Sequence, residues 1–99
     1  MKVAIIYRPK TPPPMDALPD MIGGMSAWVE QHAAKMEALY FFASGGDLGI
    51  LDIDDAAEAH RLMAEHPFTQ YAEVEVRPVV DPRTALQTLQ EVAAARAGG

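Results

Sequence analysis

The side chains of this sequence that could do chemistry are mainly histidines and tyrosines. The chain holds three histidines and no cysteine, so it has no thiolate nucleophile, no disulfide and no cysteine-ligated metal site. The glycine-rich segment 45–49 (GGDLG) is predicted to form a hairpin turn rather than a phosphate loop, because no helix follows it. Acid–base catalysis is therefore the main option.

His32 is the first candidate for a general base. It falls within an apolar stripe of a predicted helix, together with Trp28, Val29 and Met36, so its imidazole should face the sheet. Burial there would keep the imidazole neutral, as a general base requires. The alternative is a core histidine whose ring is hydrogen-bonded to a backbone carbonyl.

Tyrosine and arginine side chains could bind the substrate of such a base. Tyr7 and Tyr40, expected on adjacent segments, could donate to a developing oxyanion, although a buried tyrosine is often only a core residue. Arg8 ends the first predicted strand, where it could bind a substrate carboxylate or simply be solvated. Four aromatic side chains are expected to line a substrate pocket, or else to serve as core and dimer contacts: Trp28, Phe42, Phe68 and Tyr71.

The two later histidines do not predict a metal site. His60 and His66 are six residues apart, so they do not share one face of a helix, and zinc coordination is not expected. His60 is a second candidate for the catalytic base. His66 directly precedes Pro67 and is interpreted as a helix-end residue whose charge would favour the helix dipole.

Hydrophobic periodicity and turn signals predict four strands and three helices in a single domain over residues 1–99. The strands are expected at residues 2–8, 38–44, 48–53 and 72–80, and the last of them alternates valine with charged residues. The helices are expected from about Asp16 or Asp20 to Glu37, from Asp54 to about Glu65, and from Pro82 onward with Asp81 as N-cap. Gly23 and Gly24 are expected to break or kink the first helix, with Ser26 capping a second piece, and residues 96–99 are expected to fray.

This order of elements predicts a ferredoxin-like α+β domain (βαββαβ) with an added C-terminal helix. The helices of such a domain cover only one face of the sheet. Apolar residues occur at both parities of the first two strands, so the other face should be apolar as well. Pairing of two copies about a two-fold axis would bury that face, and we therefore expect a homodimer or a higher homo-oligomer.

The segment from the second helix to the last strand resembles a known family. Pro67, Phe68, Tyr71 and the strand residues 73–76 (EVEV) are similar to the corresponding segment of muconolactone isomerase-like proteins, which pair into dimeric α+β barrels. His60, seven residues before Pro67, matches a histidine of that group. A looser similarity, over residues 66–68 (HPF) and 75–78 (EVRP), is to YCII-related proteins. The resemblance implies a cofactor-free proton shift next to a lactone carbonyl.

Composition excludes other classes of function. The net charge is −6 and the eight lysines and arginines are scattered, which argues against a nucleic-acid partner. No apolar run approaches the ~18 residues of a membrane span, and no signal-peptide pattern is seen, so a cytoplasmic protein is expected.

The function that fits best is a small isomerase acting on an unsaturated lactone, an enone or a polyketide-like compound. A non-catalytic dimeric binding or accessory protein for a small apolar oxygenated molecule, or a cofactor-independent monooxygenase, remains the alternative.

Overall fold

The computed structural model describes residues 1–98 of the chain, which form a four-stranded antiparallel sheet and three helices. The strands are β1 (Lys2–Pro9), β2 (Met36–Phe41), β3 (Asp47–Asp52) and β4 (Ala72–Pro78), in the sheet order β2-β3-β1-β4. The helices are α1 (Leu18–His32), α2 (Ala56–Glu65) and α3 (Pro82–Gly98), with short 3-10 turns η1 (Met15–Ala17), η2 (Ala33–Lys35) and η3 (Thr69–Tyr71). This topology confirms the predicted ferredoxin-like α+β fold.

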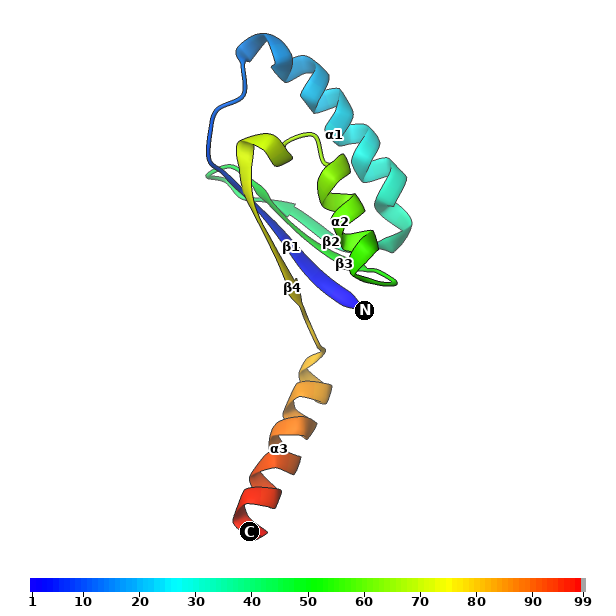
Figure 1. The fold of residues 1–99 in the computed structure, drawn as a ribbon, viewed down its shortest axis with the longest axis vertical. Helices are drawn as coiled ribbons and strands as arrows, with labels where there is room; N and C mark the ends of the chain where they lie inside the picture. Colours follow the sequence, from blue (N-terminus) through cyan, green and yellow to red (C-terminus); the bar gives the residue numbers. More distant parts are fainter. Residues whose placement is uncertain (99) are drawn as a thin grey trace.

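The sheet is covered on one side only. Helices α1 and α2 lie together against one face, whereas α3 continues from the end of β4 and points away from the rest of the chain (Figure 1). A helix of 17 residues is about 25 Å long, and its outward course accounts for overall dimensions of 64 × 26 × 23 Å. No helix within residues 1–98 is long and apolar enough to cross a membrane.

The hydrophobic core lies between the sheet and the two packed helices. In β1, the side chains of Val3, Ile5 and Tyr7 alternate toward the helices and are almost fully buried. They meet Leu51 from β3 and Leu62 from α2, which are also buried. The two-residue period of the strands therefore fixes which side chains can reach a site between sheet and helices.

Helix α1 runs without a break through its two glycines, so the predicted interruption is wrong. Met21, Met25 and Trp28 are buried along one stripe, and burial of this stripe outweighs the modest cost of glycine in a helix. The Ser26 hydroxyl donates to the carbonyl of Ile22, which is a bond of the helix interior rather than of a cap. The helix ends at His32, and β2 begins at Met36, earlier than predicted.

The starts of the other two helices follow local capping chemistry. Asp55, rather than the predicted Asp54, is the N-cap of α2, because its side chain accepts a hydrogen bond from the backbone N–H of Glu58. Asp81 accepts from the backbone N–H of Thr84, as predicted for the start of α3. Helix α3 continues to Gly98, through residues that were expected to fray; Gly99 lies outside the described residues.

The turn between β2 and β3 is longer than predicted and spans residues 42–46. Strand β2 ends at Phe41, and the turn is closed by hydrogen bonds from Phe42 N to Gly46 O and from Gly45 N to Phe42 O, each 2.9 Å long. Gly45 and Gly46 have φ angles of 102° and 89°, which side-chain-bearing residues rarely adopt. This turn places Asp47 opposite Phe41 of β2, and on its other side Asp47 lies opposite Tyr7 of β1.

Candidate functional site

Three polar side chains are buried together beneath the helices. Tyr7 is 2 % exposed, His66 is 3 % exposed and Asp47 is 6 % exposed. Burying polar groups costs free energy unless their partners compensate, and clusters of buried ionisable groups are enriched at functional sites. These residues come from β1, from the end of α2 and from the start of β3, so only the tertiary fold brings them together.

His66 is held by its backbone and ring contacts. Its Nδ1 accepts a hydrogen bond of 3.1 Å from the backbone N–H of Phe68. Its Nε2 lies 3.4 Å from Oδ2 of Asp47 without forming a hydrogen bond, and it has no other partner within residues 1–98. The ring stacks on Tyr7 at a centroid distance of 3.6 Å, and Trp28 contacts it edge-on at 4.9 Å. His66 is the C-cap of α2, as expected for a helix-end residue, and its side chain is completely buried.

Asp47 is positioned by the hairpin that precedes it. It is the first residue of β3, on the same face as the buried Leu51. Its neighbour Gly46 lies so near β1 that a Cβ there would be 2.1 Å from the carbonyl oxygen of Tyr7. The sequence carried a signal for this carboxylate, because counting back from Leu51 in steps of two puts Asp47 on the helix-facing side.

The Tyr7 hydroxyl is buried and has no hydrogen-bond partner within residues 1–98. Burial raises the pKa of Tyr7 to about 12; the nearby Thr69 hydroxyl lowers it and the charge of Asp47 raises it further. Thr69 donates its own hydroxyl hydrogen to the carbonyl of Met63. Tyr7 is therefore a neutral phenol that has a hydrogen bond to donate.

A pocket of about 490 Å³ adjoins this group, and both Tyr7 and Asp47 are part of its wall. The rest of the wall is largely apolar or aromatic and comes from the proline-rich segment after β1, from α1 and from the turn after α2. The lining residues include Pro12, Pro13, Leu18, Met25, Phe41, Phe68 and Tyr71. Phe68 and Tyr71 were predicted to line a substrate pocket, and the structure places both of them at this one.

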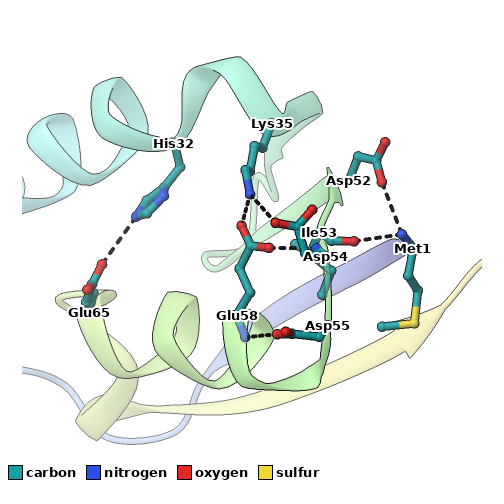
Figure 2. Close-up of polar contacts among 9 residues, drawn as sticks. All are labelled: Met1, His32, Lys35, Asp52, Ile53, Asp54, Asp55, Glu58 and Glu65. Carbon is teal, nitrogen blue, oxygen red and sulfur yellow. Dashed lines mark hydrogen bonds and ion pairs between the residues drawn. The ribbon is translucent and has the colours of Figure 1, made fainter.

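His32 lies elsewhere in the structure. Figure 2 shows its contact with Glu65 at the C-terminal end of α1, where Nε2 lies 3.4 Å from Oε2. His32 also lines a separate polar cavity of about 460 Å³. In the same region Lys35 bridges to Glu58 and, at 3.6 Å, to Asp54. His32 therefore joins two helices by a polar contact and is not among the residues that line the apolar pocket.

Trp28 is not a pocket residue either. It contacts the rings of both His32 and His66, at centroid distances of 5.2 and 4.9 Å, and its Nε1 donates to the carbonyl of Leu62. It is part of the buried core and packs edge-on against the imidazole of His66.

The expected adjacency of Tyr7 and Tyr40 is wrong, because β3 lies between the strands that carry them. Tyr40 is 69 % exposed and projects from the uncovered face of the sheet. Arg8 also projects from that face, and its Nη1 lies 2.9 Å from Oε2 of Glu75. Arg8 is thus on the opposite side of the sheet from the pocket in which it was expected to hold a carboxylate.

Two further candidates are outside the pocket. His60 is exposed on α2, and its side chain is not part of the wall. Phe42 lies in the hairpin turn and is partly exposed, whereas its neighbour Phe41 contributes to the wall. No cluster of three or more metal-ligating side chains was found among residues 1–98.

Comparison with solved structures identifies the fold. Muconolactone isomerase superposes with a TM-score of 0.71 at 15 % sequence identity, over 83 % of this chain and 92 % of that one. The chain has the muconolactone isomerase fold. The 5-chloro-2-hydroxyhydroquinone dehydrochlorinase TftG of Burkholderia phenoliruptrix AC1100, in complex with 2,5-dihydroxybenzoquinone, superposes with a TM-score of 0.65 at 20 % identity, over 83 % of this chain and 97 % of that one. No family model and no curated protein sequence matches the chain.

On this muconolactone isomerase fold, the group around the pocket combines three chemical capabilities. Asp47 supplies a carboxylate at an apolar wall, and His66 supplies an imidazole whose Nε2 lies 3.4 Å from that carboxylate. Tyr7 supplies a phenol without another partner. A carboxylate can accept a proton from a bound molecule, and a fixed hydrogen-bond donor stabilises an oxyanion.

Proposed function

We propose that this chain is a small cofactor-independent enzyme that moves a proton on an apolar, oxygenated, enolisable molecule. The observation that carries the proposal is the Asp47 carboxylate, which lines an apolar pocket and is backed by the buried His66. The base assigned from the sequence, His32, is replaced in this proposal by Asp47, because His32 borders a different cavity.

In the proposed reaction, Asp47 takes a proton from a carbon next to a carbonyl group of the substrate. The electron pair of the broken C–H bond moves toward the carbonyl oxygen, and the Tyr7 hydroxyl donates a hydrogen bond to that developing charge. Return of the proton from Asp47 to a different carbon completes an isomerisation. His66 does not touch the substrate; its Nε2, 3.4 Å from Oδ2 with no hydrogen bond formed, is the proposed positioning group for the carboxylate.

Two similarities support a reaction of this class. Muconolactone isomerase and the dehydrochlorinase TftG are enzymes, and both share this fold. Fold alone does not transmit function, so the argument rests on the residues at the pocket. An unsaturated lactone, an enone or a polyketide-like compound would present the acidic C–H bond that the chemistry needs.

The uncovered face of the sheet is the basis of a proposed homodimer. Ile6, Leu48 and Ile50 project from this face at its centre and are partly exposed. The stripe Leu86–Leu89–Val92 of α3 is also exposed. A second copy that covers the sheet and meets α3 would bury both surfaces, and a two-fold arrangement needs only one kind of contact.

The test of catalysis is deuterium uptake from heavy water into a panel of unsaturated lactones and polycyclic enones. Asp47→Asn keeps the shape of the side chain and removes the base, so we expect uptake to fall by about 10²–10⁴-fold, the usual contribution of a general base. His32→Ala is the matched control and should retain the wild-type rate. Loss of uptake in His32→Ala, with Asp47→Asn unaffected, would return the role of base to His32.

A further outcome separates catalysis from binding. If the compounds bind in the pocket but none exchanges a proton, the chain is a small-molecule-binding protein on this fold and the proposed reaction is wrong. Binding is measured by isothermal titration calorimetry on the same panel, with circular dichroism to confirm that each variant is folded.

A further inference from the structure

The charge around the pocket is unevenly distributed. Among its lining residues only Asp47 and Lys10 carry a charge. Lys10 makes no ion pair within residues 1–98, although the other two lysines, Lys2 and Lys35, each have carboxylate partners. The chain as a whole has a net charge of −6, so its general field repels anions. An unpaired ammonium at the pocket is a local exception to that field.

The backbone at Lys10 is held in place. The carbonyl oxygen of Tyr71 accepts hydrogen bonds from Lys10 N at 2.9 Å and from Thr11 N at 3.1 Å. Pro9 and Pro12 flank these two residues, and proline restricts φ on either side. The Lys10 side chain therefore extends from a fixed point, and the residue is exposed at the wall of the pocket.

The pocket is large for a one-ring compound. Its volume of about 490 Å³ lies within the range of roughly 300–1,000 Å³ that accommodates drug-sized ligands. At ~30 Å³ per water molecule in the liquid, it equals the volume of about sixteen waters. The wall is dominated by apolar and aromatic side chains, which suit flat fused rings.

We infer that the substrate class is a multi-ring, mainly apolar anion whose acidic group pairs with Lys10 while its enolisable end meets Asp47 and Tyr7. This inference rests on the proposed function and makes it more specific. An acidic group placed beside Asp47 would be repelled by the carboxylate in a poorly solvated site, so one orientation of such a molecule is favoured. Lys10 takes the role of anion anchor that Arg8 cannot fill from the other face of the sheet.

The experiment measures affinity for three compounds of nearly the same shape: 2-naphthoate, the neutral 2-acetylnaphthalene and the cationic 2-naphthylmethylammonium. Titration calorimetry at neutral pH and low salt is carried out on wild type, Lys10→Met and Lys10→Glu. Lys2→Met is the matched control, because Lys2 pairs with Glu37 and is not part of the pocket wall.

We expect wild type to bind the anion about three- to five-fold more tightly than the neutral compound, as a partly exposed ion pair allows. The preference should disappear in Lys10→Met, reverse toward the cation in Lys10→Glu, and persist in Lys2→Met. The inference is wrong if wild type binds the anion and the neutral compound with equal affinity, or if the anion preference survives in Lys10→Met. Either result leaves the proposed function standing. Failure of all three compounds to bind wild type refutes the pocket as a ligand site, and with it both proposals.

Discussion

The buried hydroxyl of Tyr7 predicts that removing one oxygen atom makes this protein more stable and less active. Tyr7→Phe keeps the ring, which stacks on His66 at 3.6 Å, and deletes only the hydroxyl that has no partner within residues 1–98. Leaving a buried polar group unsatisfied costs about 1–3 kcal/mol, part of which is offset by the contacts of the oxygen itself. We therefore expect the free energy of unfolding to rise by about 1 kcal/mol.

Such a gain is measurable in a domain of this size. One kcal/mol corresponds to a rise in melting temperature of about 4–8 °C for a domain of 60–100 residues, and urea denaturation gives the free energy directly. Tyr40→Phe is the matched control: Tyr40 is 69 % exposed, so its change should stay within about 0.5 kcal/mol. In the deuterium-uptake assay, loss of an oxyanion donor should lower the rate of Tyr7→Phe by about 10²–10³-fold.

One result would refute this reasoning. If Tyr7→Phe is destabilised by about 1 kcal/mol or more, the hydroxyl forms a hydrogen bond in solution, with Thr69 as the nearest candidate. A hydroxyl that already has a partner is not free to stabilise an oxyanion, and the role proposed for Tyr7 would fail together with the stability argument.

Three further predictions follow from the same elements. The pKa of Tyr7 is raised to about 12, so the phenol stays neutral in the folded protein. The stability due to this group is therefore complete below about pH 10 and falls by up to about 2–3 kcal/mol as the pH rises through 12. Urea denaturation between pH 9 and 12 should show this loss in wild type and less of it in Tyr7→Phe. Gly46→Ala would place a Cβ 2.1 Å from the Tyr7 carbonyl oxygen at a φ of 89°, so we expect this variant to be destabilised by more than about 1 kcal/mol. The helical control Gly23→Ala should have a small effect, because its Cβ would meet no atom within 4 Å. Ile6→Lys, opposite Glu75 in the register, should convert the proposed dimer to a folded monomer in sedimentation analysis; a wild-type monomer would refute the dimer itself.

Local sequence patterns predicted the elements of this fold well. The capping sequence Asp81-Pro82 depends only on neighbouring residues and was confirmed. The predicted last strand was confirmed as far as Pro78, whereas Val80 lies beyond it and is exposed. The glycine pair in α1 misled the prediction, because the local cost of glycine was weighed without the burial of Met21, Met25 and Trp28 against the sheet. Burial is a tertiary quantity, and it exceeded the local preference.

The sequence by itself determined the class of the fold and the kind of chemistry available: an α+β domain without thiol chemistry, whose reactive groups are carboxylates, imidazoles and phenols. It did not determine which of these groups would meet. Asp47 and His66 are 19 residues apart, and their contact depends on the register of β3 beside β1 and on where α2 ends against the core. His32 looked equally buried in one helical stripe, yet the fold directs it to Glu65 and away from the apolar pocket. Periodicity along a chain tells which face of an element is buried, but only the packing of several elements decides which buried side chains share a site.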